Sequence, residues 1–235
     1  MKKKEEMKKK EELLQQRIID YAKQMGLTND NVEPIVDGTY DINAYAQEKT
    51  RIMWMLKEPY DDFLEDGTPY GGGWSIGGVL SSADSWKTRS WQPIIYILYA
   101  FFNNIGKWND MDYIRDAPEM AEVLKRIAYV NMSKMPGKTK SNNDMSNEYK
   151  IWEPILLDQI ELYNPHIIVF GNTFKYFKDR LLIGEYISDT SNEYLGVYHC
   201  NGRLYLDAYH PQQTQITQEK YVNDILFAMR KYMKK

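Results

Sequence analysis

The chain has 235 residues, and its 30 Lys and Arg against 33 Asp and Glu leave a formal net charge of −3. With 43% hydrophobic and 27% charged residues, disorder over most of the chain is excluded. The single cysteine, Cys200, excludes an intramolecular disulfide, a four-cysteine iron–sulfur cluster and a zinc site of several cysteines. No apolar run approaches the ~20 residues that span a bilayer, and the charged N-terminus lacks an apolar signal core. We therefore expect a cytoplasmic protein with no cofactor, no metal cluster and no membrane partner.

The first twelve residues are the hexapeptide MKKKEE written twice, with six Lys and four Glu. Glutamates four residues before lysines support a helix, and apolar residues at helical spacing follow up to Gly26. We expect residues 1–26 to form one charged, amphipathic helix that docks on the rest of the chain from about Leu13. Its lysines suggest an arm for phosphate or a surface for a protein partner. A solvated helix end is the simpler interpretation, because the glutamates cancel most of the charge.

Residues 27–235 are expected to form a single α/β domain. Short apolar runs alternate with amphipathic segments of helical length, a pattern typical of a parallel sheet with helices on both faces. The sequence thus predicts a three-layer α/β/α fold with a short, mostly parallel central sheet and an N-terminal helical extension. The expected strands are 51–56, 127–130 and 166–170, with a hairpin of 194–199 and 203–206 around Asn201-Gly202, and the expected helices are 91–105, 117–125, 149–163, 173–182 and 219–233.

Chemically informative residues follow the predicted strands, where ligands of such sheets bind. Glu58, Asn131 and His210 stand at these positions, and a long glycine-rich loop at 58–82 carries Trp74. An amide reads the edge of a heterocycle, and an aromatic ring stacks on its face. A histidine stabilises charge on a carbonyl oxygen, and a carboxylate orients water or balances a sugar cation. The set indicates N-glycosidic cleavage of a nucleobase, although each residue alone has an ordinary structural explanation.

Other chemistries are less well supported. Cys200 with His199 or His210 suggests a thiol nucleophile, but its place at a hairpin turn favours a packing role. The histidines 166, 199 and 210 are too scattered for a metal site.

Five short segments resemble the uracil-DNA glycosylase superfamily. Residues 56–61, LKEPYD, resemble its first motif, GQDPYH, and residues 73–76, GWSI, resemble the segment that carries a base-stacking phenylalanine. The strand that ends in Asn131 resembles the strand whose asparagine reads the uracil edge, and residues 165–171, PHIIVFG, resemble a core segment of the superfamily. Residues 209–212, YHPQ, resemble the final HPS motif. The resemblance runs from about residue 51 to 232.

The resemblance implies a role for each matching residue. Glu58 would orient the attacking water, and His210 would bind the uracil O2. Tyr60, Trp74 and Asn131 would hold the base, with Tyr60 excluding a methyl group at C5. Possible phosphate contacts are Lys57, Ser75, Lys134 and Gln212. The implied activity is the hydrolysis of uracil, or a related damaged base, from DNA, with DNA as the partner.

The sequence also departs from these motifs. Leu56 replaces a glycine, where its side chain would crowd the pocket, and Gln212 replaces the serine of HPS. A leucine wedge after Pro211 is not evident, which favours a single-stranded substrate over a base flipped from a duplex. Two alternatives stay open. One is a non-catalytic nucleic-acid or protein-binding member of the same fold, and the other is a hydrolase of a different nucleobase or nucleoside.

Overall fold

The computed structural model describes residues 2–61, 70–80, 82, 84–137, 144–184 and 194–233. Its centre is a six-stranded sheet in the order β1-β3-β2-β4-β6-β5. Strands β3, β2, β4 and β6 are parallel, while β1 and β5 are antiparallel edge strands. The predicted α/β fold with a mostly parallel sheet is confirmed. The strands are β1 Gly38–Thr39, β2 Ile52–Leu56, β3 Ala128–Asn131, β4 Ile167–Gly171, β5 Leu195–Cys200 and β6 Arg203–Ala208.

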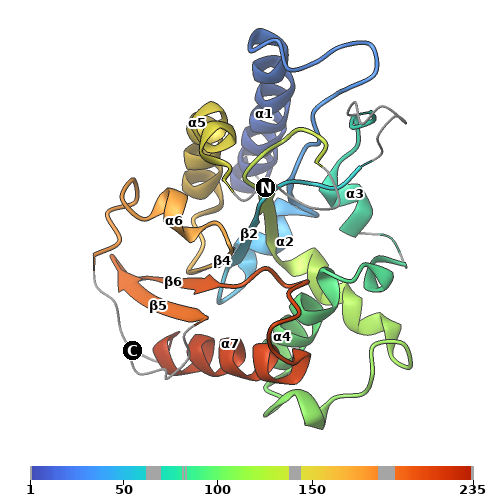
Figure 1. Cartoon of the computed structure of the whole chain (residues 1–235), viewed down its shortest axis with the longest axis vertical. Coiled ribbons are helices and arrows are strands. Elements are labelled where there is room, and N and C mark those ends of the chain that lie inside the picture. The colour runs from blue at the N-terminus through green and yellow to red at the C-terminus, as the bar shows by residue number, and fades with distance from the viewer. Residues whose placement is uncertain are drawn as a thin grey trace.

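Helices cover both faces of the sheet (Figure 1). Alternate residues of β2 enter different cores: Trp54 and Leu56 pack with α4 and α7, whereas Met53 and Met55 pack with α1 and α5. This alternation in a fully apolar strand produces the three layers. The helical elements are α1 Lys2–Gln24, α2 Ile42–Gln47, α3 Ile76–Leu80, α4 Trp91–Asn103, α5 Ser146–Tyr163, α6 Phe174–Phe177 and α7 Gln218–Met233, with the 3₁₀ helices η1 Ser85–Lys87, η2 Trp108–Asp110 and η3 Pro118–Arg126.

Asparagines end two of the long helices that pack on the sheet, α4 and α5. Asn104 follows α4 with φ 57°, and Asn164 follows α5 with φ 40°. At both residues the chain leaves its helix in the left-handed conformation that asparagine tolerates. The β5–β6 hairpin turns through Asn201 and Gly202, with φ of 52° and 76°. Positive φ at both positions is the geometry that Asn-Gly favours, and the predicted hairpin is confirmed.

Two predicted helices differ in the structure. The segment 117–125 forms the 3₁₀ helix η3 instead of an α-helix. A 3₁₀ helix rises about 2.0 Å per residue rather than 1.5 Å, so it covers more length before Ile127 enters the extended chain of β3. The segment 173–182 is α-helical only over α6, because the chain then tightens into turns and Leu182 takes a positive φ of 51°. The short β1 and α2 were not predicted, nor was the short helix α3 within the predicted loop 58–82.

The N-terminal helix docks along a stripe that includes a charged side chain whose burial was not predicted. Leu13 is 61% exposed, whereas Glu11 is only 7% exposed and lies on one stripe with Leu14 and Ile18. Glu11 Oε1 accepts hydrogen bonds from the backbone N–H of Thr39 at 3.2 Å and from its hydroxyl at 2.6 Å. Burial raises the pKa of Glu11, and the bonds from Thr39 oppose that rise. Helix α1 therefore joins the sheet at its edge strand β1.

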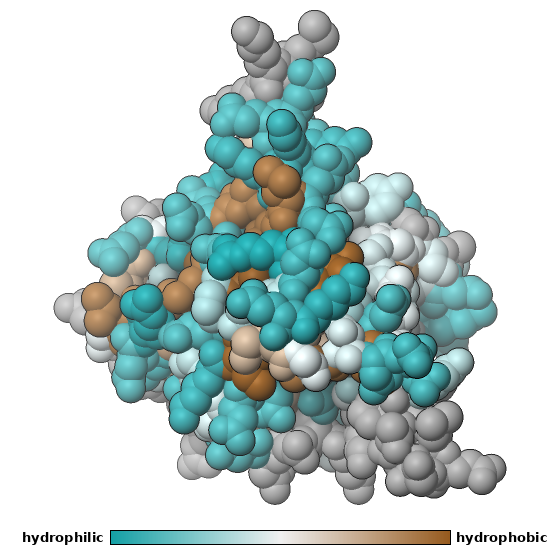
Figure 2. Space-filling model, turned by 90° about the horizontal axis from the view of Figure 1, so that it is seen from above, coloured by the Kyte–Doolittle hydropathy of each residue, from teal (hydrophilic) through white to brown (hydrophobic). Residues whose placement is uncertain are grey.

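The molecular surface is mixed. Viewed from above, hydrophobic residues are visible near the middle of the face and are bordered by hydrophilic ones (Figure 2). Within the described ranges, none of the helices combines the length and the apolar character needed to traverse a membrane.

Candidate active site at the carboxyl ends of the parallel strands

The four parallel strands end in one row. Leu56 of β2 pairs with Asn131 of β3, and Gly171 of β4 pairs with Ala208 of β6. The chains that leave β2 and β3 stay together, since Met132 N–H donates to Leu56 O at 2.8 Å. The segments that carry Glu58, Asn131 and His210 thus leave the sheet from the same edge, as parallel pairing dictates.

Leu56 packs against the neighbouring strand end. A Cβ on Gly171 would lie 2.4 Å from Leu56 Cδ2 and 3.2 Å from Pro211 Cδ. The leucine therefore fills the space that a side chain at position 171 would need. Leu56 is buried with the core on the α4 and α7 face. Its bulk is accommodated because Gly171 has no side chain.

Gly137 has a comparable relation to Glu58. A Cβ at position 137 would lie 2.3 Å from Glu58 Cγ and 2.5 Å from Glu58 Cδ. Gly137 N–H also donates to Pro59 O at 2.7 Å, which joins the segment after β3 to the segment after β2. Only glycine allows this approach without a shift of the Glu58 side chain. The close packing limits the positions that the Glu58 carboxylate takes.

His210 lies in the turn after β6. Its Nδ1 accepts a hydrogen bond from the backbone N–H of Gln212 at 3.2 Å, so in the neutral ring the proton is on Nε2. Burial, with a smaller contribution from the positive charge of Lys57, lowers the pKa of His210 to about 4. At neutral pH the imidazole is uncharged and offers an Nε2–H donor.

Asn131 ends β3 and is 1% exposed. Its backbone N–H donates to Asp37 Oδ2 at 2.6 Å. Its side-chain Nδ2 is buried and makes no hydrogen bond to any described residue. An unpartnered buried amide donor is costly, so such a group is commonly completed by a bound molecule or water.

Trp74 is held within the glycine-rich loop. The indole Nε1–H donates to Asp61 Oδ2 at 2.6 Å, and the ring packs against the core on the α4 and α7 face. The loop runs beside the segment before β1, where Gly72 takes φ +84° and a Cβ would meet Glu33 O at 1.8 Å. Its residues 62–69 lie outside the described part of the chain. Trp74 is thus anchored by the chain that follows Glu58.

The remaining predicted contacts are distributed around this edge. Tyr60 is 62% exposed and pairs through its backbone with Gly137. The Ser75 hydroxyl accepts a hydrogen bond from Gly78 N–H at 3.2 Å, so it is engaged at the start of α3. Gln212 is exposed, and Lys57 is half-buried and close enough to His210 to affect its pKa.

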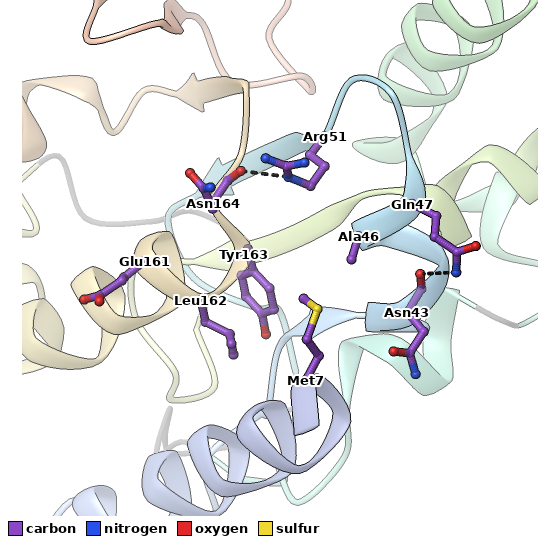
Figure 3. A pocket seen from close by; sticks show the side chains of 9 residues that line it. All are labelled: Met7, Asn43, Ala46, Gln47, Arg51, Glu161, Leu162, Tyr163 and Asn164. Atoms are coloured by element: carbon purple, nitrogen blue, oxygen red, sulfur yellow. Dashed lines mark hydrogen bonds between the residues drawn. The ribbon is translucent and has the colours of Figure 1, made fainter. Parts of the chain in front are cut away.

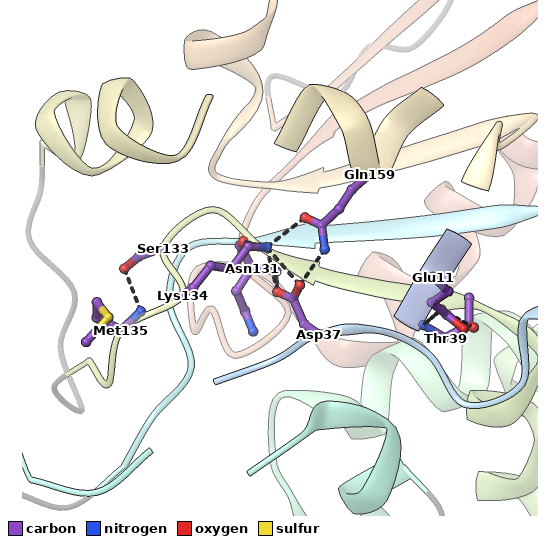
Figure 4. A network of polar contacts seen from close by, with 8 residues as sticks. All are labelled: Glu11, Asp37, Thr39, Asn131, Ser133, Lys134, Met135 and Gln159. Carbon is purple, nitrogen blue, oxygen red and sulfur yellow. Dashed lines mark hydrogen bonds and ion pairs between the residues drawn. The ribbon is translucent and has the colours of Figure 1, made fainter. Parts of the chain in front are cut away.

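Lys134 is not a phosphate contact. Its side chain is 0% exposed, and its ammonium bonds to Asp37, to Asn131 O and to Gln159 (Figure 4). The sequence prediction failed here because a lysine after a strand looks like a surface residue. The burial of Asp37 was not predicted either. Its place at the end of the apolar run Pro34-Ile-Val-Asp37 was a signal in the sequence for a buried acidic residue.

A separate hollow lies at the opposite edge of the sheet, near the start of β2 (Figure 3). Its volume is about 550 Å³, and it lies between α1, α2 and the end of α5. Arg51 Nε donates to Asn164 O at 2.8 Å on one side of it. The hollow shares none of the candidate site residues. It is lined by Met7, Asn43, Ala46, Gln47, Arg51, Glu161, Leu162, Tyr163 and Asn164.

His166 and Cys200 have structural contacts. His166 Nδ1 accepts from the backbone N–H of Arg51 at 3.0 Å, and Cys200 packs against the core on the α1 and α5 face. No three His, Cys, Asp or Glu side chains among the described residues are grouped so that they could hold a metal ion.

The chain was compared with family models and with curated proteins. No family model matches it, and no curated protein matches it.

Proposed function

We propose that the protein is an N-glycosyl hydrolase that releases uracil, or a related damaged base, from DNA. Two hydrogen-bond donors at one edge of the sheet carry the proposal. One is the Nε2–H of the uncharged His210 ring, and the other is the buried Nδ2–H of Asn131, which has no partner among the described residues. The motif resemblance adds the substrate class. The fold class and the row of strand ends are compatible with this function.

His210 suits the stabilisation of a departing base. When the glycosidic bond breaks, negative charge develops on a carbonyl oxygen of the base, and a fixed N–H donor stabilises that charge. The His210 pKa of about 4 keeps the imidazole uncharged at neutral pH. A neutral imidazole donates a hydrogen bond to the oxygen and keeps its proton. In this role His210 binds the oxygen, while Asn131 reads the base edge with its amide.

Glu58 suits the sugar side of the reaction. Its carboxylate would orient a water molecule against the anomeric carbon and balance positive charge on the sugar. The packing of Gly137 on Glu58 supports a fixed carboxylate, because catalysis by orientation requires a narrow range of positions. Trp74, anchored to Asp61, would stack on the base, and Tyr60 would stand at the rim.

The test is base release from single-stranded oligonucleotides that contain uracil, cytosine or thymine, measured by chromatography of the free base. We expect release of uracil by the wild type, and a loss of about 100-fold or more in Asn131→Ala, His210→Ala and Glu58→Gln. Cys200→Ser is the matched control and should retain wild-type activity. If the wild type releases no base from any deaminated or damaged oligonucleotide, the proposed function is wrong.

A second candidate is a hydrolase of free nucleosides. It is favoured by one observation: of the four possible phosphate contacts, Lys134 is enclosed in a buried ion pair. The same assay with deoxyuridine in place of the oligonucleotide separates the two candidates. A higher kcat/KM for the nucleoside than for the oligonucleotide would support the second.

A further inference from the structure

We propose that Asp37 and Lys134 are a positioning pair that fixes the backbone of Asn131 and so directs its amide into the active site. This inference rests on the proposed function and deepens it, because it names residues that control how the base is read. Neither residue is expected to touch the substrate. Both side chains are 0% exposed.

The pair binds both the backbone N–H and the backbone C=O of Asn131. Asp37 Oδ2 accepts from Asn131 N–H at 2.6 Å, and Lys134 Nζ donates to Asn131 O at 2.6 Å. The ammonium also lies 2.8 Å from each oxygen of Asp37. The carboxylate, the ammonium and the backbone of Asn131 thus form a closed ring of hydrogen bonds, drawn in Figure 4.

The location of the pair explains why it is needed. Strand β1 pairs only with Ala128 and Tyr129 of β3, so Asn131 lies beyond the end of its neighbour strand. Asp37, which directly precedes β1, supplies the acceptor that a longer strand would have supplied. The ionic network therefore continues the sheet at the residue where the chain must leave it.

A third residue completes the network. Gln159 of α5 donates from Nε2 to Asp37 Oδ1 at 2.7 Å and accepts from Lys134 Nζ at 2.8 Å. The three hydrogens of the ammonium thus have three acceptor groups, Asp37, Asn131 O and Gln159. This full satisfaction makes a buried charge tolerable, and it leaves the lysine little freedom to move.

The same segment aligns the stacking ring with the reading amide. Ile35 N–H donates to Lys134 O at 2.7 Å, and Val36 N–H donates to Trp74 O at 3.1 Å. The chain from Ile35 to Asp37 therefore connects the backbone of Trp74 with the backbone of Asn131. A shift of the ion pair would move one recognition element relative to the other.

Stability alone is a weak reason for this pair. Replacing a buried ion pair with apolar residues of similar size is often neutral or stabilising, whereas removing one partner leaves an uncompensated charge. The double variant Asp37→Leu with Lys134→Met removes both charges and keeps much of the volume. It separates a positioning role from a structural one, because it is expected to fold where the single variants fail.

For the double variant we expect a folded protein with a somewhat lower melting temperature than the wild type, because Gln159 and the backbone of Asn131 lose their hydrogen-bond partners. We also expect at least a 10-fold fall in kcat for uracil release, a smaller change in KM and weaker discrimination against cytosine. In the background of Asn131→Ala the double substitution should cause no further loss, since it acts through that amide. Wild-type kcat and discrimination in a folded double variant, or an additive loss in the Asn131→Ala background, would overturn the proposal.

A measurement without substrate distinguishes failure of this inference from failure of the proposed function. Hydrogen exchange at the backbone N–H of Asn131 should be at least 10-fold faster in the double variant, with a smaller change at Leu206. Equal exchange rates at Asn131 would overturn the positioning role even if the enzyme is active. The matched control is Glu48→Gln with Arg126→Met, which removes a partly exposed ion pair of 2.6 Å on η3 and should change neither readout.

Discussion

Asp61 accepts the indole N–H of Trp74 at 2.6 Å, and the same carboxylate oxygen accepts Gly72 N–H at 2.8 Å. One side chain from the motif after β2 thereby fixes both the ring of Trp74 and the loop that presents it. A Cβ on Gly71 would lie 2.8 Å from this oxygen, so the glycines allow the carboxylate to approach. Asp61 stands where the resembling motif has histidine, and in this chain its carboxylate holds the Trp74 ring and the loop in place.

The ring of Trp74 should matter more than its N–H. We expect Trp74→Phe to keep most of the affinity for a uracil-containing oligonucleotide, since the stacking face remains. Trp74→Ala should lose about 10-fold or more, because stacking of an aromatic ring on a base is worth about 1–3 kcal/mol. Binding measured by fluorescence anisotropy checks both. Equal affinity in Trp74→Ala and the wild type would remove Trp74 from the site.

Gly137→Ala should impair catalysis through Glu58. The new methyl group would lie 2.3 Å from Glu58 Cγ, so the carboxylate must move. We expect base release to fall by at least 10-fold. The matched control is Gly184→Ala, where nothing lies within 4 Å of the new Cβ and activity should be unchanged. Full activity in Gly137→Ala would show that the position of Glu58 is not critical.

Leu56 and Gly171 should be energetically coupled. Gly171→Ala overpacks the space that Leu56 occupies, which typically costs about 1–3 kcal/mol of unfolding free energy. Leu56→Ala leaves a cavity and typically costs about 2–5 kcal/mol. In the double variant the new methyl group enters the cavity, so the combined loss should be smaller than the sum. Urea denaturation of the four proteins gives this cycle, and additive losses would contradict the packing relation.

His210 should titrate far below an ordinary histidine. Burial lowers its pKa to about 4, so the folded protein binds this proton less tightly than the unfolded chain. The contribution to stability is present above about pH 6.5 and is lost as the pH falls toward 4. NMR titration of the histidine Cε1–H signals, assigned with His210→Asn, measures the value. Lys57→Met should raise it, since the lysine charge contributes to the shift, and a value near 6.5 in the wild type would contradict the burial of the ring.

Asp207 should show the opposite dependence on pH. Burial raises the pKa of this carboxyl to about 6, so its charged form destabilises the fold above that pH, and the cost disappears as the pH falls below it. Asp207→Asn is therefore expected to raise the unfolding free energy at pH 8 by about 1–2 kcal/mol, with a smaller gain near pH 4.5. Urea denaturation at both pH values checks this. The exposed Asp116→Asn is the control, and the same gain in both variants would indicate a general charge effect.

Strong local patterns made much of the fold predictable. Continuous apolar runs identified β2, β3 and β4, and Asn201-Gly202 identified the hairpin, because each pattern has few alternative structures. The same parallel pairing made it predictable that the segments with Glu58, Asn131 and His210 leave the sheet at one edge. The six-residue α2 and the two-residue β1 carry too little periodicity to be read from sequence.

The fate of charged residues was harder to foresee. Lys134 and Glu11 look like surface residues in the sequence, and both are buried because residues distant in the chain form hydrogen bonds with them: Lys134 donates to Asp37, and Glu11 accepts from Thr39. Lys134 meets Asp37, which is 97 positions away, and Glu11 meets Thr39, 28 positions away. Local pattern holds no information on such pairs, so the prediction of a phosphate contact for Lys134 was wrong.

The two copies of the N-terminal hexapeptide have unlike fates. Glu5 in the first copy is exposed, whereas its equivalent in the second copy, Glu11, is buried against Thr39. The two identical hexapeptides are therefore under unequal selective constraint. The first copy tolerates changes in composition and length. A substitution of Glu11 would remove the hydrogen bonds that join α1 to the edge strand β1. Among proteins that diverge from this sequence, the first hexapeptide should therefore lose its similarity to the second before Glu11 is replaced.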